Sequence, residues 1–400
     1  MKTISGGVTA ARGFKAAGIT CGIKKNQLPD LALIYSEVAA DAAGIFTTNQ
    51  VQAAPVILSK EFLKKGKAQA IIANSGNANA CVGAVGMEAA RRMATAVGTA
   101  LNIPMDSVLV ASTGVIGVAL PVEKIETVLA AKSVMLTENG SPAAAKAIMT
   151  TDTFPKEVAV EIELGGATVR IGGIAKGSGM IHPDMATMLG FITTDAKIEQ
   201  SLLQKAIALA GECSFNRITV DGDTSTNDTL FVLANGLAEN PPITTANNDY
   251  LTFVQALTQV CLELAKMMAR DGEGATKLVE INITGAKTEA EAVKVGKSVA
   301  TSNLVKTALF GEDANWGRIL AAVGYSGVEI DPEQILIYLG DLLVYQKGIG
   351  LVFDEAKAKG ILSQKEILIK IDLGDGTESA SVWTCDLSYD YVKINGSYRT

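Results

Sequence analysis

The strongest constraint on the fold of this chain is a hairpin signal over residues 157–174. Within it, residues 157–164 alternate, with hydrophobic residues at the even positions and glutamate at positions 157, 161 and 163. That alternation predicts a strand buried on one face. The pair Gly165-Gly166 then predicts a tight turn into a second strand over residues 167–174.

The rest of the chain mixes helical and strand signals. Helices are predicted over residues 87–102, 197–212 and 250–269, the last with Asp249 as its N-cap. Residues 70–73 read as a strand that leads into a polar loop at 74–79. A second hairpin is predicted toward the C-terminus, in which strand 367–373 passes through the Asp375-Gly376 turn to a partner strand near 379–387. Helices mixed with antiparallel hairpins predict an α+β fold in layers.

Composition excludes several classes of protein. The chain is 48% hydrophobic and 19% charged, which is typical of a globular protein. A net charge of −7 without a basic cluster argues against a nucleic-acid partner. No apolar run is long enough to span a membrane, and no signal peptide is recognisable, so we expect a cytoplasmic location. The five cysteines are widely spaced, so neither a disulfide framework nor a zinc site is expected.

The segment from Lys176 to Gly190 carries the clearest chemical signal. Its Ala186-Thr187 pair suggests a bond at which the chain cuts itself. A threonine hydroxyl is a weak nucleophile that needs a base, and cleavage would supply one as the free α-amine of Thr187. That amine has a pKa of about 7.7–8.0 and can accept a proton near neutral pH. The alternative is a glycine-rich turn that leads into a buried Met/Leu segment.

Other polar segments are open to two interpretations. Residues 111–117 are small and could expose backbone N–H groups to an oxyanion, or could form an ordinary turn. The polar clusters at 150–153, 221–228 and 270–277 could be solvated loops, but together they favour a polar small-molecule pocket. A calcium loop that starts at Asp221 fails because its twelfth position is Val232. The one histidine, His182, is expected to be structural.

Taken together, these segments resemble the ornithine acetyltransferase family, also called glutamate N-acetyltransferase, of arginine biosynthesis. The resemblance covers nearly the whole chain, and the block Lys-Gly-Ser-Gly-Met-Ile-His-Pro-Asp-Met-Ala-Thr-Met-Leu from Lys176 is its most specific part. Further matching segments are 6–8, 74–79, 112–114, 150–153, 221–228, 270–277, 311–318 and 395–397.

The resemblance implies a fold and an assembly. The fold is a layered αββα sandwich similar to self-processing amino-terminal-nucleophile hydrolases, with an additional smaller α/β lobe toward the C-terminus. Cleavage between Ala186 and Thr187 would give an α chain of residues 1–186 and a β chain of residues 187–400. The two chains would form one catalytic unit, and the family generally assembles as α2β2.

The resemblance also implies roles for single residues. Thr187 is the nucleophile, and Thr113 and Gly114 form the oxyanion hole through a hydroxyl and a backbone N–H. The substrate site is lined by Thr153, Lys176, Thr187, Glu273, Asn395 and Thr400.

The implied reaction moves acetyl from N2-acetylornithine to glutamate through an acetyl-Thr187 intermediate, with neither a cofactor nor a metal. Some family members also use acetyl-CoA as a co-substrate, and no residue of this chain decides that point. Two alternatives differ in chemistry. A self-processing aminopeptidase or amidase of the same fold would give the acyl group to water, and an amino-acid-binding protein would form no acetyl adduct.

Overall fold

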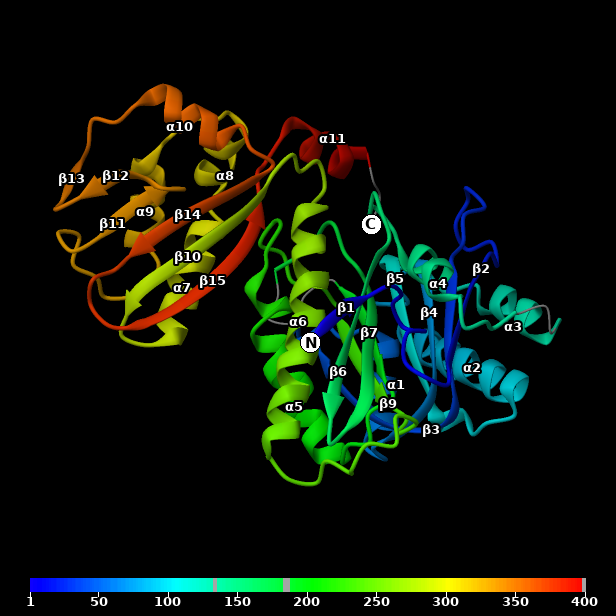
Figure 1. Cartoon of the computed structure of the whole chain (residues 1–400). Helices are drawn as coiled ribbons and strands as arrows, with labels where there is room; N and C mark the ends of the chain where they lie inside the picture. The colour runs from blue at the N-terminus through cyan, green and yellow to red at the C-terminus, as the bar shows by residue number, and fades with distance from the viewer. Residues whose placement is uncertain (132–134, 183–187, 398–400) are drawn as a thin grey trace. The chain divides into compact units, whose positions relative to one another are not determined.

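The computed structural model describes residues 1–131, 135–182 and 188–397, which fall into two compact units. Unit 1 comprises residues 1–216 and 223–268, and unit 2 comprises residues 217–222 and the described residues from Ala269 onward. Figure 1 colours unit 1 largely blue to green and unit 2 largely yellow to red. The predicted smaller C-terminal lobe is confirmed. Unit 1 contains residues on both sides of the predicted cut, so the units differ from the two predicted chains, which stay a prediction.

Unit 1 is built around a large mixed sheet. Its strands are β1 (Lys2–Ile4), β2 (Phe14–Ile19), β3 (Leu31–Phe46), β4 (Lys67–Asn77), β5 (Val108–Val115), β6 (Lys156–Leu164), β7 (Ala167–Lys176), β8 (Leu189–Thr194) and β9 (Thr229–Ala234). Its helices are α1 (Ala54–Leu63), α2 (Ala84–Leu101), α3 (Val122–Ala130), α4 (Ser141–Ile148), α5 (Gln200–Glu212) and most of α6 (Asn248–Arg270), with short 3₁₀ turns at Met105–Ser107 and Phe215–Arg217.

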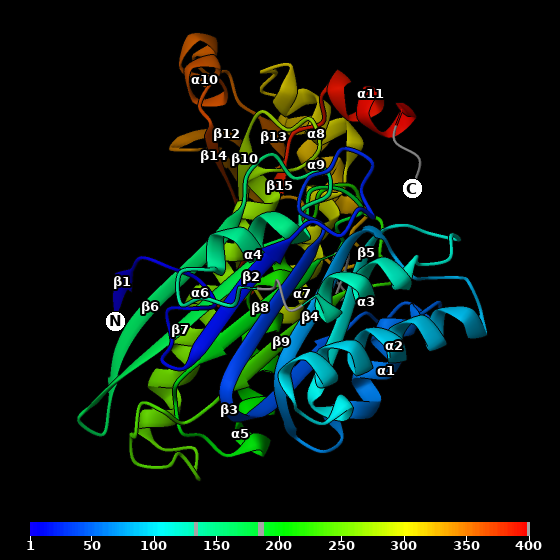
Figure 2. The same ribbon diagram turned by 90° about the vertical axis from the view of Figure 1, so that its right-hand side faces the viewer.

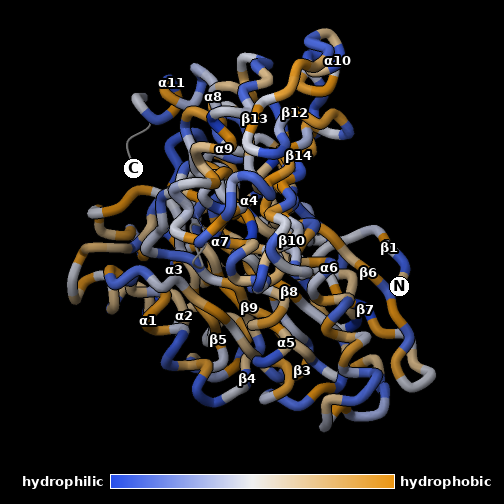
Figure 3. The backbone as a smooth tube through the Cα atoms, turned by 90° about the vertical axis from the view of Figure 1, so that its left-hand side faces the viewer, coloured by the Kyte–Doolittle hydropathy of each residue, from blue (hydrophilic) through white to orange (hydrophobic). Residues whose placement is uncertain are grey.

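The long strand β3 joins two parts of this sheet. Its first half pairs with β2 and β4, its second half pairs with β9, and its register breaks between Tyr35 and Ala40. Helices α1 and α2 pack on β5, as Figure 2 shows, whereas α5 packs on β3. Leu264 of α6 lies against Gly173 of β7. Hydrophobic side chains of β4, β5, β7, β8 and β9 meet in one core, and β9 is among the hydrophobic stretches in Figure 3. The predicted α+β layered architecture is confirmed.

The predicted hairpin at 157–174 forms as β6 and β7, whose register runs from Lys156↔Ala175 to Leu164↔Ala167. Strand β8 then pairs antiparallel with β7, and it pairs parallel with β9 on its other side. Lys176, the last residue of β7, therefore lies opposite Leu189, the first residue of β8. The segment with the predicted cut connects these two neighbouring strands.

Unit 2 has a six-stranded sheet in the order β13-β12-β11-β14-β10-β15. The strands are β10 (Leu278–Ala286), β11 (Leu336–Leu339), β12 (Leu342–Gln346), β13 (Ile349–Gly350), β14 (Glu366–Asp372) and β15 (Glu378–Cys385). The helices are α7 (Glu289–Ala300), α8 (Asn303–Phe310), α9 (Trp316–Gly324), α10 (Glu355–Leu362) and α11 (Tyr389–Ser397).

The predicted C-terminal hairpin is wrong. Both strands exist as β14 and β15, but β10 lies between them, parallel to β14 and antiparallel to β15. The Asp375-Gly376 turn carries the chain across the end of β10, where a Cβ on Gly376 would lie 2.1 Å from the carbonyl oxygen of Ala286. Neither Asp375 nor Gly376 has the positive φ of a two-residue hairpin turn, and the left-handed residue of this segment is Gly374 at φ 66°. The pairing is decided by β10, a strand far earlier in the chain.

Three further boundaries differ from the predictions. Helix α6 begins before Asp249, because the side chain of Asn247 accepts the N–H of Tyr250 and caps the helix. Helix α5 begins only at Gln200, since Ile198 forms a parallel bridge with Ile243. The polar residues after position 73 continue β4 through Asn77 instead of forming a loop. No helix among the described residues is long and apolar enough to cross a membrane.

Candidate active site

A buried ion cluster lies where β6 begins and β7 ends. Asp152 Oδ1 accepts hydrogen bonds from Lys156 Nζ and from the backbone N–H of Gly177, both at 2.7 Å. Its Oδ2 accepts the N–H of Thr150 at 3.0 Å and lies 4.0 Å from Lys176 Nζ. The cluster fixes the end of β7 to the loop before β6.

The cluster holds more positive than negative charge. Burial acts to raise the pKa of Asp152, but Lys176 and Lys156 outweigh it and hold this pKa at about 2. Lys24 lies close enough for Lys176 to lower its pKa, although burial is the larger cause. Lys24 is also balanced by the buried Asp30, so three lysines lie near two carboxylates and one positive charge is in excess. Such an excess favours an anionic ligand, such as the carboxylate of an amino acid.

Lys176 also links this cluster to strand β5. Its ammonium donates to Thr150 Oγ1 at 2.8 Å and to Thr113 Oγ1 at 3.4 Å. A hydroxyl that accepts from an ammonium keeps its own proton for another acceptor. The structure thus brings together two of the predicted site residues, Lys176 and Thr113, with the hydroxyl of Thr113 able to donate.

Gly114 follows Thr113 and is required by close strand packing. It pairs with Gly76 of the parallel strand β4 and adopts φ +132°. A Cβ on Gly114 would lie 2.4 Å from the carbonyl carbon of Gly76, so a larger residue cannot fit without movement of the backbone. The glycine that supplies the predicted oxyanion N–H is therefore also needed for the packing of β4 on β5.

Behind these two residues lies a network of buried amides. Ser112 Oγ donates to Asn74 Oδ1 at 2.6 Å, and Asn227 Nδ2 donates to the carbonyl oxygens of Ser112 and Ala78 at 2.8 and 2.6 Å. Asn227 immediately precedes Asp228 and β9, so the network ties the segment before β9 to β5. These contacts hold the backbone around Thr113 rigidly, as oxyanion stabilisation requires.

Met188, the residue after the predicted nucleophile, is held by hydrogen bonds to both its backbone N–H and its backbone carbonyl. The N–H of Met188 donates to Asp228 Oδ1 at 2.8 Å, and the carbonyl of Met188 accepts the N–H of Thr229 at 3.1 Å. Asp228 is itself held because its carbonyl accepts the N–H of Thr47. The chain is thus anchored immediately after Thr187.

A second group of predicted residues lies in unit 2. Asn395 Nδ2 donates to Glu273 Oε2 at 2.7 Å, so helix α11 is linked to the loop before β10. The same loop is also held by Asp386, which follows β15. The carboxylate of Asp386 accepts hydrogen bonds from the backbone N–H groups of Thr276 and Lys277 in the loop. The Glu273 side chain is buried and Asn395 is exposed.

The remaining predicted site residues are less informative. Thr153 is exposed beside the buried Asp152. Ala186, Thr187 and Thr400 lie outside the described residues. The backbone carbonyl of His182 accepts a hydrogen bond from Thr224 Oγ1 at 3.1 Å. Among the described residues there is no group of three metal-ligating side chains.

Sequence reasoning missed Lys156 and the specific role of Asp228. Lys156 begins β6, one residue before the alternating pattern that was recognised. Its spacing of four residues from Asp152 is the one signal that could have suggested a pair. Asp228 was considered only as the last residue of the polar cluster 221–228, and its position directly before a buried strand gave no hint of its partner.

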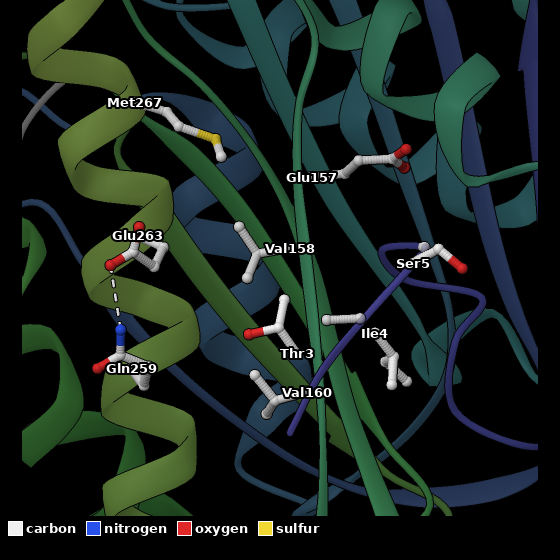
Figure 4. Close-up of a pocket in the computed structure, with 11 residues that line it drawn as sticks. Thr3, Ile4, Ser5, Glu157, Val158, Val160, Gln259, Glu263 and Met267 are labelled. Carbon is white, nitrogen blue, oxygen red and sulfur yellow. Dashed lines mark hydrogen bonds between the residues drawn. The ribbon is translucent and has the colours of Figure 1, made fainter. Parts of the chain in front are cut away.

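A cavity of about 560 Å³ lies elsewhere in unit 1, beside β1, β6 and α6 (Figure 4). Gln259 and Glu263, which line it, are hydrogen-bonded to each other at 3.0 Å. None of the predicted site residues lines this cavity. It therefore gives no support to the predicted chemistry.

The comparisons with known proteins identify the family. A sequence family described as the ArgJ family matches residues 15–400. The chain belongs to the ArgJ family. The arginine biosynthesis bifunctional protein ArgJ of Symbiobacterium thermophilum is 54% identical over 402 residues, which cover 100% of both chains. The family resemblance seen in the motifs is thereby confirmed.

Two solved structures are also similar. That of the arginine biosynthesis bifunctional protein argJ from Bacillus halodurans is 47% identical, covers 52% of this chain and 97% of that chain, and has a TM-score of 0.50. The ornithine acetyltransferase of Mycobacterium tuberculosis, solved in complex with ornithine, is 41% identical, covers 44% of this chain and 94% of that chain, and has a TM-score of 0.41.

Proposed function

We propose that this chain transfers an acetyl group from N2-acetylornithine to glutamate, giving ornithine and N-acetylglutamate. Membership of the ArgJ family makes it an acyltransferase of arginine biosynthesis. The observation that carries the proposal is the contact of Lys176 with Thr113 in a buried site with excess positive charge. Such a site suits a substrate that carries a carboxylate and a carbonyl to be activated.

The proposed enzyme is formed by cleavage between Ala186 and Thr187. Thr187 Oγ attacks the carbonyl carbon of Ala186, the C–N bond breaks, and water hydrolyses the resulting ester. The solved chain of Bacillus halodurans supports two chains. The match covers 52% of the 400 residues of the present chain and 97% of the Bacillus halodurans chain. The Bacillus halodurans chain is therefore about 214 residues long, which is the length from Thr187 to Thr400.

Acetyl transfer then uses the same threonine. Thr187 Oγ attacks the acetyl carbonyl carbon of acetylornithine, and the α-amine of Thr187 accepts the hydroxyl proton. The Thr113 hydroxyl and the Gly114 N–H stabilise the oxyanion. The α-amine then passes the proton that it took from Thr187 to the nitrogen of ornithine, as the C–N bond breaks. The neutral amine of glutamate then attacks the acetyl carbonyl carbon, and the ester C–O bond to Thr187 breaks. The extra proton on the glutamate nitrogen passes through the α-amine to Thr187 Oγ, so N-acetylglutamate leaves and the hydroxyl is restored. The atoms balance without a cofactor.

The substrate contacts are proposed from the family pattern. Lys176 is suited to the substrate carboxylate and Glu273 to a cationic amine. Thr153, Asn395 and Thr400 complete the proposed set. We further propose α2β2 assembly of residues 1–186 and 187–400. The relatives are named bifunctional, which supports acetyl-CoA as a second acetyl donor.

The first test is a denaturing intact-mass spectrum with amino-terminal sequencing. Two chains, of which the second begins Thr187-Met-Leu-Gly, are expected in place of one 41.6 kDa chain. Thr187→Ala should leave an uncut, inactive chain, whereas Thr187→Ser should be cut to some degree because it keeps a hydroxyl. A single chain that still transfers acetyl would overturn the mechanism.

A kinetic test separates acetyl transfer from hydrolysis. Acetylornithine and glutamate, varied together, should give parallel double-reciprocal lines, because one product leaves before the second substrate binds. Intersecting lines would contradict the acetyl-enzyme. Rapid release of acetate without glutamate would favour the alternative, an amidase of the same fold.

A further inference from the structure

The loop 20–30, between β2 and β3, is held in place by one buried carboxylate. Asp30 Oδ1 accepts the N–H of Cys21 at 2.7 Å. Its Oδ2 accepts the N–H groups of Ile23 and Lys24 at 2.6 and 3.0 Å. Asp30 itself is fully buried. Because one charged side chain holds three amides of the loop, the position of the Lys24 backbone is fixed by the fold.

The side chain of Lys24 lies against the strand pair that carries the predicted oxyanion donors. A Cβ on Gly76 of β4 would come within 3.1 Å of Lys24 Cγ, so the stem of the lysine packs on this glycine. Gly76 is paired with Gly114 of β5. The lysine stem therefore lies next to one half of the predicted oxyanion hole.

The ammonium of Lys24 contacts the same short segment as that of Lys176. Lys24 Nζ donates to the carbonyl oxygens of Pro29 and Met149 at 2.9 and 2.7 Å. Lys176 Nζ donates to Oγ1 of the next residue, Thr150, at 2.8 Å. Both described acceptors of Lys24 are carbonyls, and an ammonium has three N–H groups, so one remains for a ligand.

The charges around these two ammonium groups favour an anion between them. Burial is the largest cause that lowers the pKa of Lys24, and Lys176 lowers it further. Asp30 and Asp152 act in the opposite direction. Asp30 is bonded to the backbone of its loop, and Asp152 is bonded to Lys156. A negative group bound between Lys24 and Lys176 would relieve the repulsion of the two cations.

We infer that Lys24 binds the substrate α-carboxylate together with Lys176 and so makes the enzyme select α-amino acids over simple amines. This inference rests on the proposed function, which assigns that carboxylate to Lys176 alone. A carboxylate has two oxygens, so each can accept a hydrogen bond from one ammonium. The loop 20–30 thereby becomes part of the substrate site.

Ornithine and putrescine isolate the contribution of the carboxylate, because putrescine is ornithine without its α-carboxylate. Inhibition of transfer from N2-acetylornithine gives an inhibition constant for each. Lys24→Met should raise the constant of ornithine about 10–100-fold, as expected for a lost hydrogen bond between charged groups, and should change that of putrescine little. Lys24→Arg keeps the charge and should recover part of the loss. Equal changes for ornithine and putrescine would overturn the inference.

The same variant should separate binding from chemistry. Lys24→Met should raise KM for N2-acetylornithine and for glutamate more than it lowers kcat, because the lost contact is present before and during the reaction. A fall in kcat with both KM values unchanged would contradict a role in binding the carboxylate.

Lys124→Met is the matched control. Lys124 Nζ also donates to the loop 20–30, at the carbonyl of Gly22, but Lys124 is exposed and lies on α3. This variant should leave the inhibition constants of ornithine and putrescine nearly unchanged. A loss of ornithine binding as large as that of Lys24→Met would show that the lysines act only by holding the loop, and would contradict the inference.

A measurement on the wild-type enzyme decides the question if Lys24→Met does not fold. Limited labelling with propionic anhydride, followed by peptide mass spectrometry, gives the reactivity of Lys24 relative to the exposed Lys124. Ornithine should protect Lys24. Putrescine at the same concentration should not, although its two amines consume the reagent as those of ornithine do. Equal labelling of Lys24 in the two solutions would overturn the inference.

The outcomes separate this inference from the proposed function. If the wild type transfers no acetyl from N2-acetylornithine to glutamate, the proposed function fails, and this inference fails with it. If the wild type transfers acetyl but Lys24→Met affects ornithine and putrescine alike, only the role of Lys24 fails.

Discussion

Lys176 Nζ, at the end of β7, donates a hydrogen bond to Thr113 Oγ1 on β5 over 3.4 Å. The two residues are 63 positions apart in the chain and both are buried. The contact sets the direction in which the threonine hydroxyl can donate, because the ammonium occupies a lone pair. A hydroxyl oriented before the reaction costs no reorganisation when an oxyanion forms.

Thr113→Val should lower kcat by about 10²–10³, because it removes one oxyanion donor and keeps the shape of the side chain. Thr113→Ser keeps the hydroxyl and should retain most of the activity. Steady-state acetyl transfer to glutamate measures both. Equal activity of the valine variant and the wild type would show that the hydroxyl does not contact the oxyanion.

Gly114→Ala should destabilise unit 1, because the new Cβ would lie 2.4 Å from the backbone of Gly76. Gly117→Ala is the matched control, since Gly117 also has a positive φ, of 78°, but a Cβ there would have no atom within 4 Å. The control should lose about 1 kcal/mol from backbone strain, and Gly114→Ala clearly more. Urea unfolding monitored by circular dichroism gives both values, and similar losses would contradict the packing argument.

Lys156→Met should lower the free energy of unfolding by about 3–5 kcal/mol, because Asp152 then loses its closest cation in a buried site. Lys67→Met is the control, because Lys67 forms a partly exposed ion pair with Asp41. It should lower the free energy of unfolding by less than about 1 kcal/mol. Urea titration of both variants tests this difference. A loss for Lys156→Met as small as that for Lys67→Met would show that Lys176 alone neutralises Asp152.

Asp152 should make stability depend on acid pH. Its pKa of about 2 in the folded chain lies below the unfolded value of about 3.9, so its contribution is fully present above about pH 4 and is lost as pH falls toward 2. The difference amounts to about 2–3 kcal/mol. The pH dependence of urea unfolding for the wild type should therefore be steeper between pH 4 and 2 than for Asp152→Asn. If the unfolding free energies of the wild type and of Asp152→Asn changed with pH in parallel, the lowered pKa of Asp152 would be contradicted.

The sequence predicted local structure better than long-range pairing. The hairpin of β6 and β7 was found because its alternation and its Gly165-Gly166 turn lie within one short segment. The pairing of β14 and β15 was predicted wrongly because β10, far earlier in the chain, lies between them. A turn signal indicates where the chain reverses, but not which strand it meets.

The same limit applies to the site. Motifs identified Thr113 and Lys176, and the structure brings them together. Lys156 and Asp228 were not recognised, because the folded sheet decides which partner each of them meets. A charged residue at a strand end looks like an ordinary solvated terminus until the opposite strand is known.

The position of β8 and β9 has a consequence for handling the enzyme. These two strands follow the predicted cut, yet β7 lies on one side of them and β3 on the other, and both belong to the part before the cut. The two polypeptides would therefore be interleaved within one sheet, held by backbone ladders along two seams. An affinity tag on either polypeptide should recover both in equal amounts, and only denaturants should separate them.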